Sequence, residues 1–166
     1  MRKLLACVLS LTLLHVSMVQ AAVRGKSARY SGGTIAAYKD AVNGKWDLEE
    51  TQMVFTPDKK EWTKLTVPYD KVESLEFGQK VGRRVGAALA GAMIVSPVFL
   101  LFLFSHKKKH FLTIGFKDSD GKPQGAVFEL AKGIVPESLQ FLETKTGKKV
   151  EYETDEARKS VGKEKP

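Results

Sequence analysis

Alternating apolar and polar residues between positions 33 and 77 predict several short β-strands. An alternation of period two is the pattern of a strand with one buried face. It is clearest over 61–67, which follows a turn at 57–60 that contains a proline and an aspartate. By the same criterion, strands are predicted over 33–38, 45–48, 51–56, 61–67 and 71–77.

A second alternating region follows later in the chain and predicts a hairpin. Its two strands are expected over 110–117 and 124–130, with a glycine-containing turn over 118–122 between them. The spacing of Asp118 and Asp120 in this turn is similar to the start of a calcium-binding loop. The later oxygen ligands of such a loop are missing from the sequence, so we interpret the segment as a turn.

The pattern then changes to a helical one. Pro136 suits the first turn of a helix, an apolar stripe begins at Leu139, and Gly147 suits the position just after the helix. A short extended piece is expected over 149–153. The charged tail 154–166 is expected to be disordered, because it holds too few apolar residues to pack.

The N-terminal residues have the pattern of a secretory signal peptide. A short basic head precedes an apolar body over 4–19, and small residues surround position 21. This order predicts export, with residues 1–21 removed as the signal peptide and 22–32 left as a linker. An uncleaved N-terminal anchor is the alternative, although the apolar body is shorter than the ~20 residues that span a bilayer.

A second apolar run, over 85–104, contains no charged residue. Its length matches the hydrocarbon thickness of a bilayer at about 1.5 Å per helical residue. We therefore expect a membrane-embedded segment over 80–106, and the simplest form is one spanning helix. Basic residues stand at both ends of the run, so the positive-inside rule does not orient it.

Pro97 divides this run into a half with small residues and a half with bulky ones. Small residues at helical spacing form a face that allows close helix packing. One arrangement is a re-entrant helical hairpin whose two ends lie on the same side of the membrane; the other is a spanning helix that dimerises. Proline is tolerated in membrane helices and does not decide between them. The predicted packing face consists of Gly82, Gly86, Ala90 and Gly91.

The amount of predicted structure favours one domain built from both polar halves. Two strands and one helix in the C-terminal half are too few for an independent core, because domains of that size are marginal without metals or disulfides. We therefore predict a mainly β fold with a C-terminal helix (α+β). A partly open barrel is expected from 33–79 and 107–153, interrupted by the membrane-embedded segment.

The order of elements also resembles a known family. The turn and strand over 67–75 read VPYDKVESL, after early strands at 33–35 and 53–55 and before a closing amphipathic helix. This order resembles a split pleckstrin-homology-like (PH-like) domain of the bacterial or GRAM-like kind. It implies the barrel fold and a binding role.

Four stretches resemble, more closely, small uncharacterised exported bacterial membrane proteins. That resemblance implies no activity. The stretches are 69–77, 78–86, 107–110 and 125–130.

Composition and charge exclude several classes of function. The chain holds 27 Lys+Arg and 19 Asp+Glu, a formal net charge of +8, and a single cysteine. That cysteine, Cys7, lies in the predicted signal peptide, so neither disulfides nor thiolate chemistry are expected in the mature chain. Charges of both signs are mixed evenly along an exported chain, which argues against nucleic-acid binding.

The basic residues at the two ends of the apolar run are the candidate site. Two of them are histidines four positions apart, but no carboxylate or thiolate completes a metal shell, so no metal or cofactor is expected. We predict a membrane-interface basic cluster that anchors the ends of the run or attracts anionic lipid headgroups, at about 1 kcal/mol per charge. Its members are Arg83, Arg84, His106, Lys107, Lys108, Lys109 and His110.

These patterns predict a binding or scaffold module rather than an enzyme. No Ser–His–acid arrangement is recognisable, and no residue is assigned a catalytic role. We expect an exported protein of the cell envelope, attached to the inner membrane with its polar domain on the periplasmic side, that binds a protein or lipid partner. The alternative is a structural membrane protein that forms homo-oligomers through its small-residue helix face.

Overall fold

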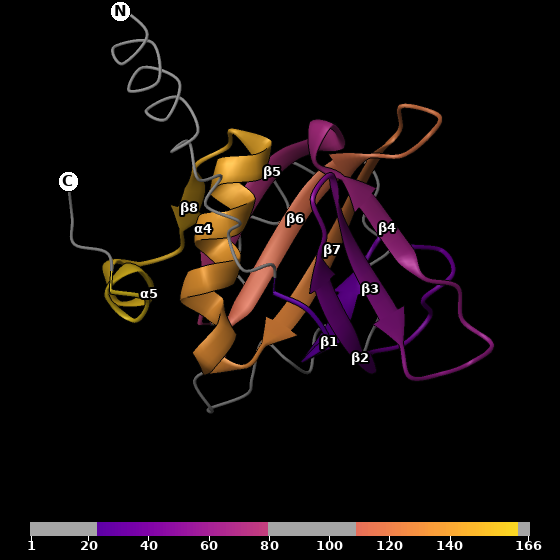
Figure 1. Ribbon diagram of the computed structural model, residues 1–166, viewed down its shortest axis with the longest axis horizontal. Helices are drawn as coiled ribbons and strands as arrows, with labels where there is room; N and C mark the ends of the chain where they lie inside the picture. Colours follow the sequence, from indigo (N-terminus) through magenta and orange to yellow (C-terminus); the bar gives the residue numbers. More distant parts are fainter. Residues whose placement is uncertain (1–22, 80–108, 163–166) are drawn as a thin grey trace, which may run out of the picture.

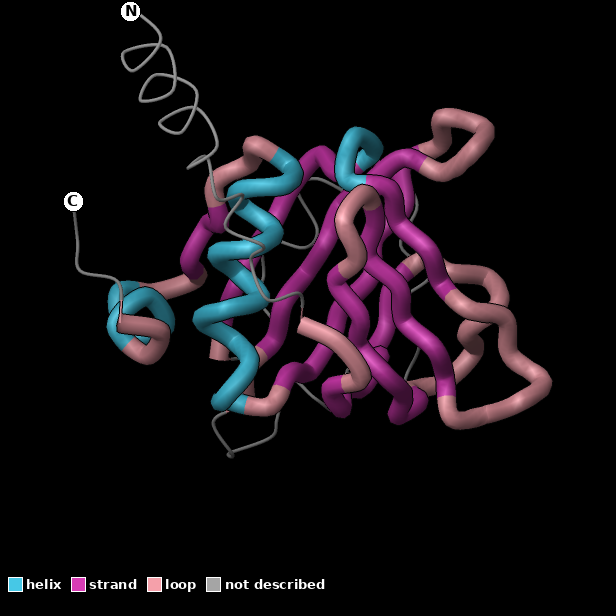
Figure 2. Tube along the Cα trace, viewed as in Figure 1, coloured by secondary structure: helices cyan, strands magenta, loops and turns pink. Residues whose placement is uncertain are grey.

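The computed structural model describes residues 23–79 and 109–162 (Figures 1 and 2). Within these described residues, eight strands and four helical segments follow one another. The strands are β1 (Lys26–Gly33), β2 (Val42–Leu48), β3 (Gln52–Pro57), β4 (Leu65–Pro68), β5 (Val72–Gly78), β6 (Phe111–Lys117), β7 (Pro123–Leu130) and β8 (Val150–Tyr152). The helical segments are the 3₁₀ turns η1 (Tyr69–Lys71) and η2 (Lys132–Ile134) and the helices α4 (Val135–Thr146) and α5 (Asp155–Lys159).

All eight strands belong to one sheet in the order β4-β3-β2-β1-β7-β6-β5-β8. Each neighbouring pair is antiparallel except β5 and β8, which run parallel. The two polar halves meet at three places, where β1 pairs with β7 and where β5 pairs with β6 and with β8. The sheet curls into a half-barrel (Figure 1), so the prediction of a mainly β fold with a C-terminal helix is confirmed.

Aromatic side chains from both halves fill the inside of the curled sheet. Phe128 of β7 is fully buried and lies 4.9 Å from the Trp46 ring of β2 and 5.2 Å from the Phe55 ring of β3, centroid to centroid. In β2 every second side chain is buried, as the period-two pattern of a half-buried strand requires. One continuous hydrophobic core therefore holds the two halves together.

Helix α4 lies against the part of the sheet near β5, β6 and β8 (Figure 1). Its start and end follow the predicted signals, with a proline in the first turn and Gly147 in a left-handed conformation at φ 68°. Leu139 and Leu142 are buried, and the Phe141 ring lies 6.1 Å from the ring of Tyr69. The helix thus buries the apolar stripe that the sequence predicts.

The first strand lies earlier than the sequence pattern indicates. The prediction of a strand over 33–38 is wrong, and most of the expected linker 22–32 belongs to β1. Its polar sequence becomes a strand because it is paired on both sides, with β2 and with β7, and such tertiary pairing overrides weak local propensity. The strand ends at Gly33, after which the chain loops to β2.

The expected disordered tail also contains structure. Helix α5 forms within it, and Ala157 of that helix is fully buried. The Thr154 hydroxyl accepts a hydrogen bond of 3.1 Å from the Ala157 backbone N–H, and Asp155 and Glu156 stand in the first turn. A capping hydroxyl and acidic residues at a helix start each stabilise a short helix.

Candidate functional site

The residues just before and just after the apolar segment lie side by side. In the register of β5 and β6, Gly78 is paired with Phe111, at the end of one strand and the start of the next. Paired residues of antiparallel strands have Cα atoms about 5 Å apart. The chain therefore leaves the sheet and returns to it at the same place. Within the described residues, no helix has the length and apolar character needed to cross a bilayer.

Two members of the predicted basic cluster, Lys109 and His110, lie at this place. The Lys109 ammonium is 2.8 Å from the Glu129 carboxylate, and both side chains are about one-quarter exposed. The His110 ring stacks nearly parallel on Phe77 at 6.0 Å. Burial, and then the charge of Lys132, lower the pKa of His110 below its ordinary value of 6.5. Neither residue is thus a freely solvated cation at neutral pH.

The rest of the predicted cluster, the helix-packing face and the break in the apolar run lie outside the described residues, as does the signal peptide. The residues concerned are Arg83, Arg84, His106, Lys107 and Lys108, then Gly82, Gly86, Ala90 and Gly91, and finally Pro97.

We expect His110 to make stability fall as the pH decreases. Its pKa is lower in the folded chain than in the unfolded chain, so the unfolded chain binds more protons below about pH 6.5. The free energy of unfolding should therefore decrease between pH 7 and pH 5, and by less in His110→Phe than in the parent chain. Urea unfolding at both pH values measures the difference, and carboxylates that titrate equally in both proteins cancel. An equal decrease in the two proteins would contradict the prediction.

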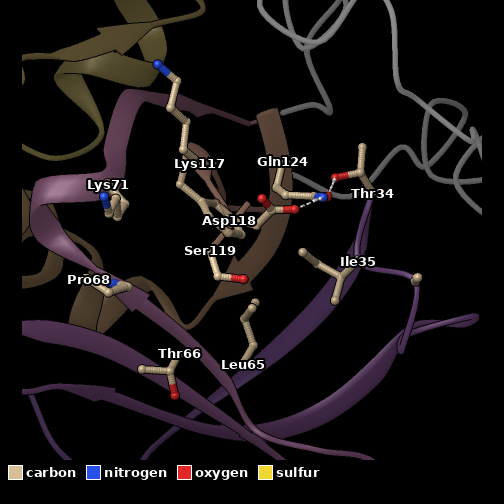
Figure 3. A pocket seen from close by; sticks show the side chains of 12 residues that line it. Thr34, Ile35, Leu65, Thr66, Pro68, Lys71, Lys117, Asp118, Ser119 and Gln124 are labelled. Carbon is tan, nitrogen blue, oxygen red and sulfur yellow. Dashed lines mark hydrogen bonds between the residues drawn. The ribbon is translucent and has the colours of Figure 1, made fainter. Parts of the chain in front are cut away.

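A hollow of about 610 Å³ lies at the other end of β6 (Figure 3). Strand β4, the loop after β1 and the turn between β6 and β7 surround it. Its volume falls in the range of pockets that hold small ligands, about 300–1,000 Å³. The residues that line it are Thr34, Ile35, Ala36, Leu65, Thr66, Pro68, Lys71, Phe116, Lys117, Asp118, Ser119 and Gln124, and we call it the β4 pocket.

A chain of hydrogen bonds holds one wall of the β4 pocket in place. The Asp118 carboxylate accepts a bond of 2.9 Å from the Gln124 side-chain amide, and the Gln124 carbonyl oxygen accepts one from the Thr34 hydroxyl (Figure 3). The Gly125 backbone N–H donates to the same hydroxyl at 2.9 Å. These bonds fix the β6–β7 turn to the loop after β1, two segments about 90 residues apart in the sequence.

The Asp118 carboxylate accepts several hydrogen bonds that hold this wall in shape. Besides Gln124, the backbone N–H groups of Asp120 and Lys122 donate to its carboxylate at 3.0 and 2.9 Å. The hydrogen bond from Gln124, followed by that from Lys122, lowers the pKa of Asp118. The prediction of a hairpin turn over 118–122 is confirmed, and within residues 23–79 and 109–162 no group of three metal-ligating side chains gathers.

Strand β4 forms the opposite wall and is one edge of the sheet. The Tyr69 backbone N–H donates to the Thr51 carbonyl at 3.1 Å, and hydrogen-bonded positions alternate along an antiparallel pair. The register of β3 and β4 therefore turns the backbone groups of Thr66 and Pro68 away from β3, toward the free edge. Proline has no N–H, so over these two positions the edge offers an incoming strand a single hydrogen-bond donor, the Thr66 N–H.

The sequence patterns did not predict the β4 pocket. Leu65 and Phe116 look like ordinary inward residues of alternating strands, and Asp118 like a turn residue. They become one site only through the curl of the sheet, which brings three distant segments together. A glycine pair just before Thr34 was the one local signal of a bend at this position.

The pocket is far from the chain ends that lead into the apolar segment. Phe111 stands at the start of β6, and Phe116 and Lys117 at its end. A strand rises about 3.3 Å per residue, so the two places are about 20 Å apart.

The sequence matches no protein-family model and none of the curated proteins with which it was compared.

Proposed function

We propose that the chain is an exported, membrane-attached binding module of PH-like architecture, without catalytic activity. The observation that carries the proposal is the pairing of Gly78 with Phe111, which brings together the two ends of the apolar segment. Attachment through that segment then leaves both polar halves on one side of the membrane. There they form the single sheet that holds the β4 pocket.

The sheet itself supports this topology. Strands β1 and β7 come from different sides of the apolar segment in the sequence, yet they are hydrogen-bonded neighbours. Such a ladder requires both halves in one compartment, because a bilayer core about 30 Å thick separates the two faces of a membrane. Of the two arrangements of the apolar segment, the hairpin with both ends on one side agrees with the sheet. The sheet therefore supports the hairpin over the single spanning helix.

Binding, rather than catalysis, suits the polar groups of the β4 pocket. Asp118, Gln124 and Thr34 are hydrogen-bonded to one another or to the backbone, and these bonds hold the wall in shape. The hydrogen bonds that Asp118 accepts lower its pKa, which makes it a poor base at neutral pH. Strands β1 to β7 form a curled sheet, and helix α4 follows them in the chain and packs on this sheet. This order of seven strands and a closing helix supports the PH-like assignment.

Single cysteines test the topology, because the predicted mature chain contains none. Asp58→Cys places a thiol in the N-terminal half and Ser119→Cys places one in the C-terminal half, both in exposed turns. We expect a membrane-impermeant maleimide to label both from the same side, with the cysteine-free chain as the control. Labelling of Ser119→Cys only after the inner membrane is permeabilised would remove the proposal.

A further inference from the structure

The charges and apolar surface of the β4 pocket point to a class of ligand, an inference that rests on the proposed binding function. We propose that the pocket binds a small single-chain amphiphile with one anionic head, of the aliphatic carboxylate class. The apolar body would lie against Ile35, Leu65 and Phe116, and the head beside Lys71. Each part of this assignment follows from a different set of contacts.

The apolar part of the ligand follows from the walls. Ile35 and Leu65 are half-buried and face the hollow together with Ser119 (Figure 3), and Pro68 adds a further apolar surface. Phe116 is 5% exposed, so it lies at the bottom of the hollow rather than on its rim. Burying an apolar chain here removes apolar surface from water, which favours binding. A purely polar ligand would gain none of this free energy.

The negative charge of the ligand's head group is inferred from the charged residues that line the pocket and from which of them already have a partner. The Lys117 ammonium is 2.8 Å from the Glu73 carboxylate, and in Figure 3 its side chain extends away from the hollow. Asp118 is held by the hydrogen bonds of the wall. Among the described residues that line the pocket, Lys71 is the charged group without an ion pair or hydrogen bond. A single negative charge on the ligand complements it.

Two other kinds of ligand fit the pocket less well. An added peptide strand needs alternating N–H and C=O groups along β4, but Pro68 removes a donor at the free edge. A polyphosphorylated lipid headgroup in the bilayer needs several cations. Of the two lysines that line the pocket, Lys117 is paired with Glu73, which leaves Lys71 as the unpaired one. The pocket also lies about 20 Å along β6 from the membrane-attached end. A soluble amphiphile with one charge meets neither difficulty.

Protection of a cysteine in the pocket tests the proposal. The predicted mature chain, in which Ser119→Cys is the single cysteine, is placed in lipid nanodiscs and alkylated with iodoacetamide in the presence of increasing octanoate. We expect octanoate to slow alkylation saturably at position 119, because the bound chain covers that side chain. The same titration on Asp58→Cys, which lies outside the β4 pocket, should show no slowing. Alkylation of position 119 at the same rate with and without octanoate would overturn the proposal.

The charge is tested by changing the lysine and the ligand separately. In the Ser119→Cys background, Lys71→Gln should weaken protection by octanoate roughly threefold, as expected for an exposed ion pair. Lys60→Gln, an exposed lysine outside the pocket, should leave it unchanged. Neutral octanamide should protect the parent less than octanoate does, and equal protection by the two would overturn the anionic assignment. Flotation of the same protein with liposomes measures membrane attachment independently, so failure of the ligand assignment and failure of the proposed function are distinguishable.

Discussion

Replacing Phe128 by alanine should destabilise the whole domain by about 3–5 kcal/mol, the usual cost of removing a buried phenylalanine. The ring is fully buried, and the three aromatic rings packed around it belong to the other half of the chain. It lies 4.9 Å from the Trp46 ring, 5.2 Å from that of Phe55 and 5.9 Å from that of Tyr30. The alanine variant leaves a cavity between β7 and the strands β1 to β3.

Urea unfolding of the full-length chain, followed by tryptophan fluorescence, measures this effect. Trp46 is in the N-terminal half and fully buried, so it reports on a half that the substitution does not touch in sequence. The conservative variant Phe128→Leu should cost less, because it fills most of the volume. A fluorescence transition at an unchanged urea concentration in Phe128→Ala would mean that the two halves fold separately, and would contradict the single-sheet fold.

Local signals explain which elements the sequence reveals. Strands β2, β3, β5, β6 and β7 were predicted to within three residues, because apolar residues recur in each next to a turn with proline, glycine or aspartate. The strand predicted over 61–67 was wrong over 61–64, and only its end belongs to β4. Helix α4 was predicted from Pro136 and Gly147, whose conformational preferences mark helix ends. These signals act over a few residues, and tertiary contacts agree with them.

The elements that the sequence missed depend on distant partners. Strand β1 carries Lys26, Arg29 and Ser31 among its few apolar residues, so its strand character comes from pairing with β7, about 100 residues later. The β4 pocket has the same origin, because Thr34 and Gln124 meet only when β1 and β7 lie side by side. By contrast, the union of the two halves was predictable from size, since the C-terminal half is too small to form a core.

Gly33→Ala should also destabilise the domain, by about 3 kcal/mol or more, at the junction between the two halves. Gly33 has φ 147°, a region that residues with a side chain rarely adopt, at a cost of order 1–3 kcal/mol. A methyl group there would in addition overlap the backbone carbonyl oxygen of Gly125, in the neighbouring strand β7. Backbone cannot move aside as the end of a flexible side chain can, so β1 and β7 would have to separate at this point.

A matched glycine distinguishes this clash from a general effect of the substitution. Gly133 is exposed, has no atom within 4 Å of an added Cβ and has no positive φ, so Gly133→Ala should leave the free energy of unfolding nearly unchanged. In the Gly33 variant, the Thr34 hydroxyl should also lose its bonds to Gln124 and Gly125, which opens the wall of the β4 pocket. Alkylation of Ser119→Cys in that background should then lose its protection by octanoate. Equal unfolding free energies for the two glycine variants would mean that β1 and β7 do not approach each other as closely as their register requires.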